Sequence, residues 1–196
     1  VERAQEIACV LEAYNFKHKV VMDGMALKAN EIMSRHPDYL RDPEMFKRAI
    51  GGAEWITGWS RRRKVANEPC VIISPAGMLV GGSAIFYTQQ IMNSEKNGIA
   101  LVSYQGEGTP GKMLLEKRVA NFDGRMHKCY ADVKRFEFSG HNSRHELFEI
   151  LDRVKGNPKV LCVHGDGPSC TRFAEEIREK YGYEAQAPEQ GQVVEV

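Results

Sequence analysis

Two histidines stand where short apolar runs end in polar turns. His141 follows the segment Phe-Glu-Phe-Ser-Gly at residues 136–140, and His164 follows the apolar residues 160–163. Ligands of α/β proteins gather at the carboxyl ends of parallel strands, so histidines at two such ends can converge on one substrate. An imidazole in such a place binds a metal ion or acts as a general acid or base. We therefore predict that both rings face one cleft.

The residues that follow His141 also allow a simpler interpretation. His141 and His145 have the four-residue spacing of a metal-binding pair on one helix face. The favoured alternative is a helix capped by Asn142 or Ser143, with Glu146 in its first turn and His145 in solvent.

His164 precedes Gly165 and Asp166. Its position is equally consistent with a metal ligand, a general acid or base, and a polar strand end. Asp166 is predicted to be the N-cap of the helix that follows, because a short carboxylate side chain accepts from the first free backbone amides.

Two glycine-rich turns each follow a predicted strand and precede a predicted helix. Residues 74–82 read Ser-Pro-Ala-Gly-Met-Leu-Val-Gly-Gly, and residues 105–112 read Gln-Gly-Glu-Gly-Thr-Pro-Gly-Lys. Backbone N–H groups at a helix start bind phosphate, so two such turns favour a phosphate-rich ligand along one edge of a sheet. The alternative is a pair of tight turns that need glycine for their backbone conformation, with Ser83 as a helix N-cap.

The second turn has the spacing of the phosphate-binding loop of nucleotide hydrolases. Those enzymes require a serine or threonine hydroxyl after the lysine to hold Mg²⁺. Here Lys112 is followed by Met113, whose thioether cannot replace a hydroxyl on a hard cation. A nucleotide-binding enzyme of the P-loop type is therefore the weaker enzyme hypothesis.

The overall charge limits how the chain can bind a polyanion. With a net charge of +1 over 196 residues, binding of nucleic acid by bulk charge is disfavoured, and any such site must be local. Residues 61–64, Arg-Arg-Arg-Lys, form one basic run that could extend a phosphate track. Trp55 and Trp59 nearby either stack bases or pack in the core, and core packing is the more frequent fate of tryptophan.

The cysteines and the apolar pattern indicate a cytoplasmic protein. Five cysteines without a Cys-x-x-Cys motif predict reduced thiols and a reducing compartment. No apolar run is long enough to span a membrane, and no leader is recognisable. Because the chain begins at Val1 inside a helical pattern, we expect it to be a piece of a longer protein.

The elements that must position these residues alternate along the chain. Proline interrupts the pattern near residues 37 and 43, and most apolar runs are bounded by turn residues. The alternation predicts an α/β fold with a mostly parallel sheet and helices on both faces. The predicted strands are residues 20–22, 70–74, 99–103, 133–138 and 159–163. A first helix is predicted from Ile7, Val10, Leu11 and Tyr14, which recur at helical spacing, and another is predicted to start at the proline breaks near residues 37 and 43. The other predicted helices are residues 25–33, 83–92, 112–118, 146–154 and 171–181.

The order of the motifs resembles the β-CASP metallo-β-lactamase ribonucleases, the archaeal relatives of the cleavage and polyadenylation specificity factor nuclease. The likeness spans nearly the whole chain, since Arg-Ala-Gln-Glu near the start and Ala-Pro-Glu near the end also resemble that family. The segments concerned are residues 3–6, 73–82, 104–112, 138–141, 163–166 and 187–189.

The resemblance implies a division of the chain. Residues 1–134 would form the β-CASP domain, a Rossmann-like three-layer sandwich with a mostly parallel sheet. Residues 135–196 would be the C-terminal α/β segment that returns to the metallo-β-lactamase domain. The N-terminal metal-binding part of that domain would lie outside this chain.

The resemblance also implies a metal-dependent chemistry. In that family two zinc ions, held mainly by a His-x-His-x-Asp-His loop, activate water to cut an RNA phosphodiester. This chain has no such loop. His164 corresponds to a zinc ligand and His141 to a general acid beside the scissile phosphate. Where the family often has His-Ala-Asp, this chain has Asn142-Ser143 after the histidine, so the role of that aspartate has no counterpart here.

The expected function is part of a zinc-dependent ribonuclease in mRNA 3′-end processing or RNA decay. Its partners would be single-stranded RNA, the metal-binding part and, through an exposed apolar face, a second copy in a homodimer. Alone, the chain is expected to bind zinc weakly or not at all and to be inactive as a nuclease. The rival hypothesis is a stand-alone RNA-binding or scaffold module. The residues implied in RNA binding are Ser74, Gly77, Met78, Gly81, Gly82, Tyr104, Gln105, Gly108, Thr109, Gly111 and Lys112.

Overall fold

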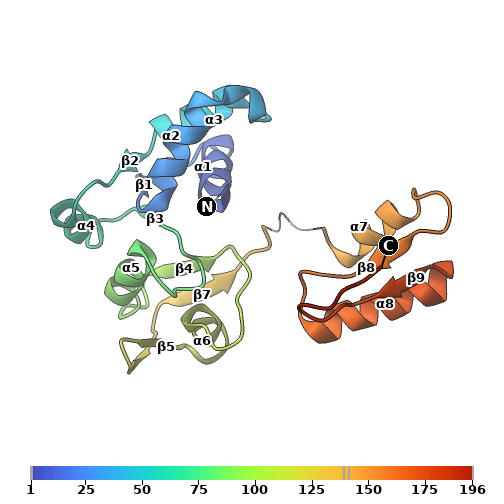
Figure 1. Cartoon of the computed structure of the whole chain (residues 1–196). Coiled ribbons are helices and arrows are strands. Elements are labelled where there is room, and N and C mark those ends of the chain that lie inside the picture. The colour runs from blue at the N-terminus through green and yellow to red at the C-terminus, as the bar shows by residue number, and fades with distance from the viewer. Residues whose placement is uncertain (1, 139, 141, 196) are drawn as a thin grey trace. The chain divides into compact units, whose positions relative to one another are not determined.

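The chain folds into two compact units, Val1–Ser139 and Gly140–Val196, shown in Figure 1. The computed structural model describes residues 2–138, 140 and 142–195, so the predicted catalytic residue His141 lies outside the described residues. No helix in these described segments is long and apolar enough to cross a membrane.

The first unit begins with a parallel three-stranded sheet. The strand order is β2-β1-β3, and Val21 of the central strand pairs with Glu54 on one side and Ile72 on the other. All three strands therefore end at the same edge. The strands are β1 (Val20–Met22), β2 (Glu54–Trp55) and β3 (Val71–Ile73), and the helices in this part are α1 (Glu2–Ala13), α2 (Met25–Arg35), the 3-10 turn η1 (Pro37–Tyr39), α3 (Pro43–Gly51) and α4 (Trp59–Val65).

Small side chains let the first helices pack closely on this sheet. Ala4 and Ala8 of α1 and Ala49 of α3 are buried in one cluster with Met22 and Phe46. Because alanine costs no side-chain entropy in a helix and adds little bulk, it suits a close helix contact. A second cluster, made by Val21, Ile56, Val65 and Tyr87, lies beside α4.

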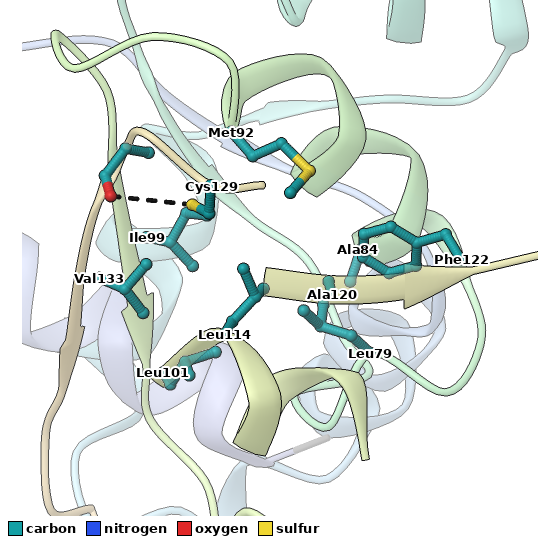
Figure 2. Close-up of a cluster of buried hydrophobic side chains, with 11 residues drawn as sticks. Leu79, Ala84, Met92, Ile99, Leu101, Leu114, Ala120, Phe122, Cys129 and Val133 are labelled. Carbon is teal, nitrogen blue, oxygen red and sulfur yellow. Dashed lines mark hydrogen bonds between the residues drawn. The ribbon is translucent and has the colours of Figure 1, made fainter. Parts of the chain in front are cut away.

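The rest of the first unit is a second, smaller layer of strands and helices. The strand β4 (Gly98–Leu101) pairs in parallel with β7 (Asp132–Arg135), and β5 (Val119–Phe122) forms an antiparallel hairpin with β6 (Arg125–Lys128). Its helices are α5 (Ser83–Ile91) and α6 (Pro110–Lys117). Figure 2 shows Leu114 of α6, fully buried, among Leu101, Ile99 and Ala120.

The second unit repeats the strand and helix alternation on a smaller scale. Its elements are α7 (Arg144–Leu151), β8 (Lys159–Leu161), α8 (Gly167–Tyr181) and β9 (Glu184–Gln186), and β8 pairs with β9 in parallel. Phe148 of α7 and Ala174 and Ile177 of α8 form its buried core. Gly182 ends α8 in the left-handed conformation, φ +69°, as glycine does at helix ends.

The α/β class and the parallel strand pairs expected from the sequence are confirmed. The three-layer sandwich and the division at residue 134 remain predictions. The strand predicted at residues 99–103 is observed as the shorter β4, Gly98–Leu101. Its residues alternate between exposed and buried, so one side of the strand faces solvent. All five cysteines are free thiols, as expected.

Of the three predicted N-caps, only the one at the start of α7 is confirmed with its capping hydrogen bonds. Ser143 and Glu146 form a reciprocal capping box at the start of α7, and the side chain of His145 is 81% exposed. Ser83, expected as an N-cap, is instead the first residue of α5 after Gly82, whose φ of +76° suits glycine. Asp166 is at the N-cap position of α8, but its side chain makes no capping hydrogen bond.

Candidate functional site

The turn of residues 74–82 joins the end of β3 to the start of α5. Its two ends are tied together, because the hydroxyls of Ser74 and Ser83 lie 2.7 Å apart. Leu79 is buried with φ +60°, and Gly82 gives α5 its N-cap. The turn therefore places the first backbone amides of α5 at the carboxyl edge of the sheet, where α/β proteins bind ligands.

The turn of residues 105–111 leads from β4 to α6 with the residues that a helix start prefers. Thr109 is the N-cap, its hydroxyl accepts from the backbone N–H of Lys112 at 3.3 Å, and Pro110 follows it. The same hydroxyl donates to the carbonyl of Gly106 at 2.7 Å. Gly108 has φ +73°, which glycine adopts without strain.

The two turns contact each other directly. The backbone N–H of Gly111 donates to the carbonyl of Met78 at 3.0 Å. The Gln105 side-chain amide donates to the carbonyls of Gly77 at 3.2 Å and Ser103 at 3.0 Å. A Cβ atom on Gly77 would lie 2.1 Å from the Ser103 hydroxyl, so this approach requires glycine. The structure thus brings the predicted residues of both turns into one surface.

The side chains on this surface divide into buried supports and exposed groups. Gln105 is 3% exposed, and its Oε1 atom is buried without a partner among the described residues. Its contacts lie within the protein. Tyr104 is 68% exposed, and both its ring and the sulfur of Met78 lie against Gly106. Exposed aromatic rings on which bases stack are one component of surfaces that hold single-stranded nucleic acid.

Lys112 is held by two carboxylates. Its ammonium lies 2.7 Å from Glu107 and 3.3 Å from Glu116. These hydrogen bonds raise the pKa of Lys112, so it stays protonated. A phosphate at this turn therefore competes with Glu107 for the lysine.

Half of the basic run at residues 61–64 serves the fold. The Arg61 guanidinium bridges Glu54 and Glu68, and Lys19 contacts the same two carboxylates at 2.7 and 2.6 Å. Hydrogen bonds from Arg61 and Lys19 lower the pKa of Glu54 to about 2. Arg63 and Lys64, which are exposed, are therefore the two residues of this run that remain candidates for phosphate contacts.

The sequence reasoning missed a buried carboxylate at the end of β1. Asp23 is 1% exposed and accepts from the Arg62 guanidinium at 2.6 and 2.8 Å and from the Tyr87 hydroxyl at 2.7 Å. Burial alone would raise the pKa of Asp23, but these hydrogen bonds and that from Gly24 hold the pKa below its usual range. The sequence signal for this site was Asp23 itself, a charged residue directly after the apolar residues 20–22.

His164 lies in the turn between β8 and α8. It is exposed and has a left-handed backbone, φ +67°, which is uncommon outside glycine but which histidine, like asparagine and aspartate, adopts more often than other residues. Gly165 beside it lies against the Cys170 sulfur, because a Cβ on this glycine would be 2.9 Å away. The convergence of His141 and His164 in one cleft remains a prediction, since His141 is not among the described residues.

The described residues do not assemble a zinc centre by themselves. No three side chains of histidine, cysteine, aspartate or glutamate gather within the described ranges in a way that could hold a metal ion. A catalytic zinc requires three protein ligands and an open position. His164 alone cannot meet that requirement.

Two known protein-family domains match this chain, one after the other along the sequence. Residues 4–114 match the Beta-Casp domain, and residues 127–188 match the Zn-dependent metallo-hydrolase RNA specificity domain. The chain belongs to the β-CASP metallo-β-lactamase ribonuclease family. The resemblance deduced from the sequence motifs is thereby confirmed.

Relatives in this β-CASP family are archaeal proteins of greater length. RNase aCSPSF2 of Saccharolobus solfataricus is 37% identical over 98% of this chain and 39% of its own length. Transcription termination factor FttA is 32% identical in Methanocaldococcus jannaschii and 33% in Thermococcus kodakarensis, each over 96% of this chain. The chain spans 33% and 32% of those two proteins. It thus corresponds to between about a third and two fifths of these relatives.

Proposed function

We propose that this chain is the RNA-holding part of a zinc-dependent ribonuclease of RNA processing or decay. The observation that carries the proposal is the joined surface of the two glycine-rich turns. The contacts of Gly111 with Met78 and of Gln105 with Gly77 hold two helix starts side by side in a β-CASP domain. One relative is named as an RNase, which supports the same activity for the whole protein.

The proposed contacts to single-stranded RNA come mainly from the backbone. The backbone N–H groups that would position phosphates are those of Gly77, Met78, Gly81, Gly82 and Gly108, because the N–H groups of Leu79, Thr109 and Gly111 donate to carbonyls within the protein. The exposed Tyr104 ring would stack a base. Such contacts fix the strand without reading its sequence, so we propose a broad RNA tolerance. Gln105 is buried, and we assign it the role of positioning the two turns rather than touching RNA.

The catalytic part of the proposal combines two histidines of this chain with residues outside it. We propose that His164 is one zinc ligand of the whole protein and that His141 is its general acid. The other ligands would come from the metal-binding part of the metallo-β-lactamase domain, which is the proposed partner of this chain. Zinc bound there would lower the pKa of a water molecule and so supply the nucleophile. The chain alone is proposed to be inactive and free of stoichiometric zinc. Free thiols at all five cysteines support a cytoplasmic setting.

The test of this proposal measures RNA binding and cleavage separately. The 196-residue chain should bind fluorescein-labelled oligouridylate, release no cleavage product with added Zn²⁺, and show no stoichiometric zinc in elemental analysis. Gly111→Ala should weaken RNA binding, because the new Cβ would collide with Gln105. Gly51→Ala is the matched control, since nothing lies within 4 Å of its Cβ position. RNA binding that is absent, or equal in both variants, contradicts the proposal.

The same assays address the two rival functions. A stand-alone RNA-binding module would bind RNA equally well but would remain inactive when joined to the metal-binding part. A P-loop enzyme would bind ATP through Lys112. The ion pairs of Lys112 with Glu107 and Glu116 and the absence of a hydroxyl at Met113 disfavour this second alternative.

A further inference from the structure

An exposed tryptophan begins the helix that follows β2. Trp59 is the first residue of α4 and is 58% exposed. Tryptophan has the largest apolar side chain, and folding normally removes most of its surface from water. A tryptophan that keeps this much surface in solvent is a candidate contact for a ligand. The sequence had favoured core packing for it, and the structure contradicts that expectation.

The Trp59 ring is held in place by two neighbours. The Phe86 ring meets it edge to face at 90°, with the centroids 5.5 Å apart. The Arg62 guanidinium carbon lies 4.5 Å from the Trp59 ring centroid, in cation–π geometry. The exposed part of the ring is therefore presented in one fixed orientation.

Arg62 is itself fixed by the buried carboxylate of Asp23. The guanidinium makes two hydrogen bonds to this carboxylate, which also accepts from the Tyr87 hydroxyl. Breaking this arrangement would leave a buried charge without its partner, which is costly. Arg62 thus has little freedom to leave the tryptophan, and the ring is preorganised for stacking.

Direct contacts connect this position to the turn of residues 74–82. Asp23 accepts from the backbone N–H of Gly24 at 2.5 Å. Gly24 in turn packs on that turn, because a Cβ there would lie 2.7 Å from the Ser83 hydroxyl and 3.8 Å from the Pro75 ring. Trp59 is therefore linked through Arg62, Asp23 and Gly24 to the surface proposed to bind RNA phosphates.

The charge next to Trp59 favours a polyanion. Arg63 lies four residues after Trp59, on the same face of the helix, and Lys64 follows it. Both are exposed, and neither makes an ion pair with any residue the structure describes. An aromatic ring with adjacent free cations suits a nucleotide, whose base stacks while its phosphate contacts the cation.

We propose that Trp59 is a base-stacking platform for single-stranded RNA, with Arg63 as its phosphate contact. The proposal rests on the proposed function and extends the RNA-binding surface beyond the two glycine-rich turns. It assigns a second binding position at the same edge of the first unit. Because stacking on an aromatic ring accepts every base, this position adds affinity without sequence preference.

The experiment compares Trp59→Leu with the wild-type chain. Binding of a labelled oligouridylate, followed by fluorescence anisotropy, should weaken at least about fivefold, as expected for the loss of one stacked base. The factor should be the same at low and high salt, because stacking involves no counterion release. RNA should also quench tryptophan fluorescence in the wild type and leave it nearly unchanged in Trp59→Leu, which retains only Trp55.

Two further variants complete the design. Arg63→Ala should lower the slope of log affinity against log salt by about one, as for one lost phosphate contact. Tyr39→Leu is the matched control, since Tyr39 is 88% exposed on the η1 turn and should leave RNA binding unchanged. Circular dichroism checks that each variant folds.

The outcomes separate this inference from the proposed function. RNA binding with equal affinity in Trp59→Leu and the wild type, without quenching, overturns the stacking site and leaves the proposed function standing. The same result would favour a protein side chain as the occupant of the Trp59 surface. Failure of the wild-type chain to bind RNA overturns both.

Discussion

Gly111 is the residue at which the two glycine-rich turns meet. Its backbone N–H donates to Met78, and a Cβ at this position would lie 2.0 Å from the Gln105 Oε1 atom and 3.2 Å from the Gly77 carbonyl oxygen. The Gln105 side chain cannot move away from such a Cβ without losing its hydrogen bonds to the carbonyls of Ser103 and Gly77. The requirement for glycine is therefore one of space rather than of backbone conformation.

Replacing Gly111 by alanine tests this steric argument. Alanine is the better helix former by about 1 kcal/mol, so propensity alone predicts stabilisation at Gly111 in α6 and at Gly51 in α3. The clash at Gly111 should reverse the sign and destabilise the fold by about 1–3 kcal/mol. Gly51→Ala should be neutral or slightly stabilising. Urea unfolding followed by circular dichroism measures both, and equal stability of the two variants would refute the steric argument.

Contacts between residues close in the sequence could be predicted from it, whereas contacts between residues far apart in the sequence could not. The Ser143 and Glu146 cap joins residues three apart, and its chemistry depends only on a helix start. Arg62 and Asp23 are 39 residues apart, and their contact exists only because α4 packs beside the end of β1. The exposure of Trp59 also depends on how α4 packs beside the end of β1. The sequence alone does not show this packing, so the expectation that Trp59 is buried in the core was wrong.

At the scale of elements, a charge network joins the first sheet to α4. Lys19 precedes β1, Glu54 lies in β2, Arg61 lies in α4, and Glu68 precedes β3. Each cation contacts both carboxylates, so the network fixes the spacing of three strands and a helix. The spacing of seven residues on either side of Arg61 gave no sequence signal, because these partners lie in different elements.

The network predicts a specific loss of stability in acid. The pKa of Glu54 is lowered from 4.5 to about 2, so its contribution to stability is complete above pH 4.5 and is lost as the pH falls towards 2. The thermal unfolding midpoint should therefore decrease as the pH is lowered from 4.5 to about 2. The decrease should be less steep in Glu54→Gln, which has no carboxylate to protonate at this position. Glu44→Gln on the surface of α3 is the control and should follow the wild type. A Glu54→Gln variant with the wild-type pH profile would count against the network.

Secondary structure was most predictable where a turn residue marked the end of a pattern. The predicted helices at residues 25–33, 83–92 and 171–181 all exist, with ends shifted by a few residues. The hairpin of β5 and β6 was missed, although Asp123 and Gly124 form its turn with φ +52° and +75°. An Asp-Gly pair is a strong hairpin signal, but its flanking residues alternate too weakly to identify strands.

At the scale of the whole molecule, the second unit exposes apolar side chains along β8. Val160 and Cys162 face its core, while Leu161 and Val163 at the alternate positions are 38% and 65% exposed. Alternate residues of an extended segment share one side, so this side is apolar and open. Since the relatives are more than twice as long as this chain, we propose that another part of the whole protein covers it.

Without that covering part, the isolated chain should self-associate through this side of β8. Sedimentation velocity should show a weight-average mass that rises with protein concentration above the 22.1 kDa of the monomer. Val163→Thr should reduce the association, because a hydroxyl replaces an apolar methyl group at the contact. Val80→Thr is the matched control, since Val80 is 66% exposed in the turn of residues 74–82 and should leave the association unchanged. A single species of monomer mass at every concentration would show that this side needs no partner, and the possible homodimer would then be excluded.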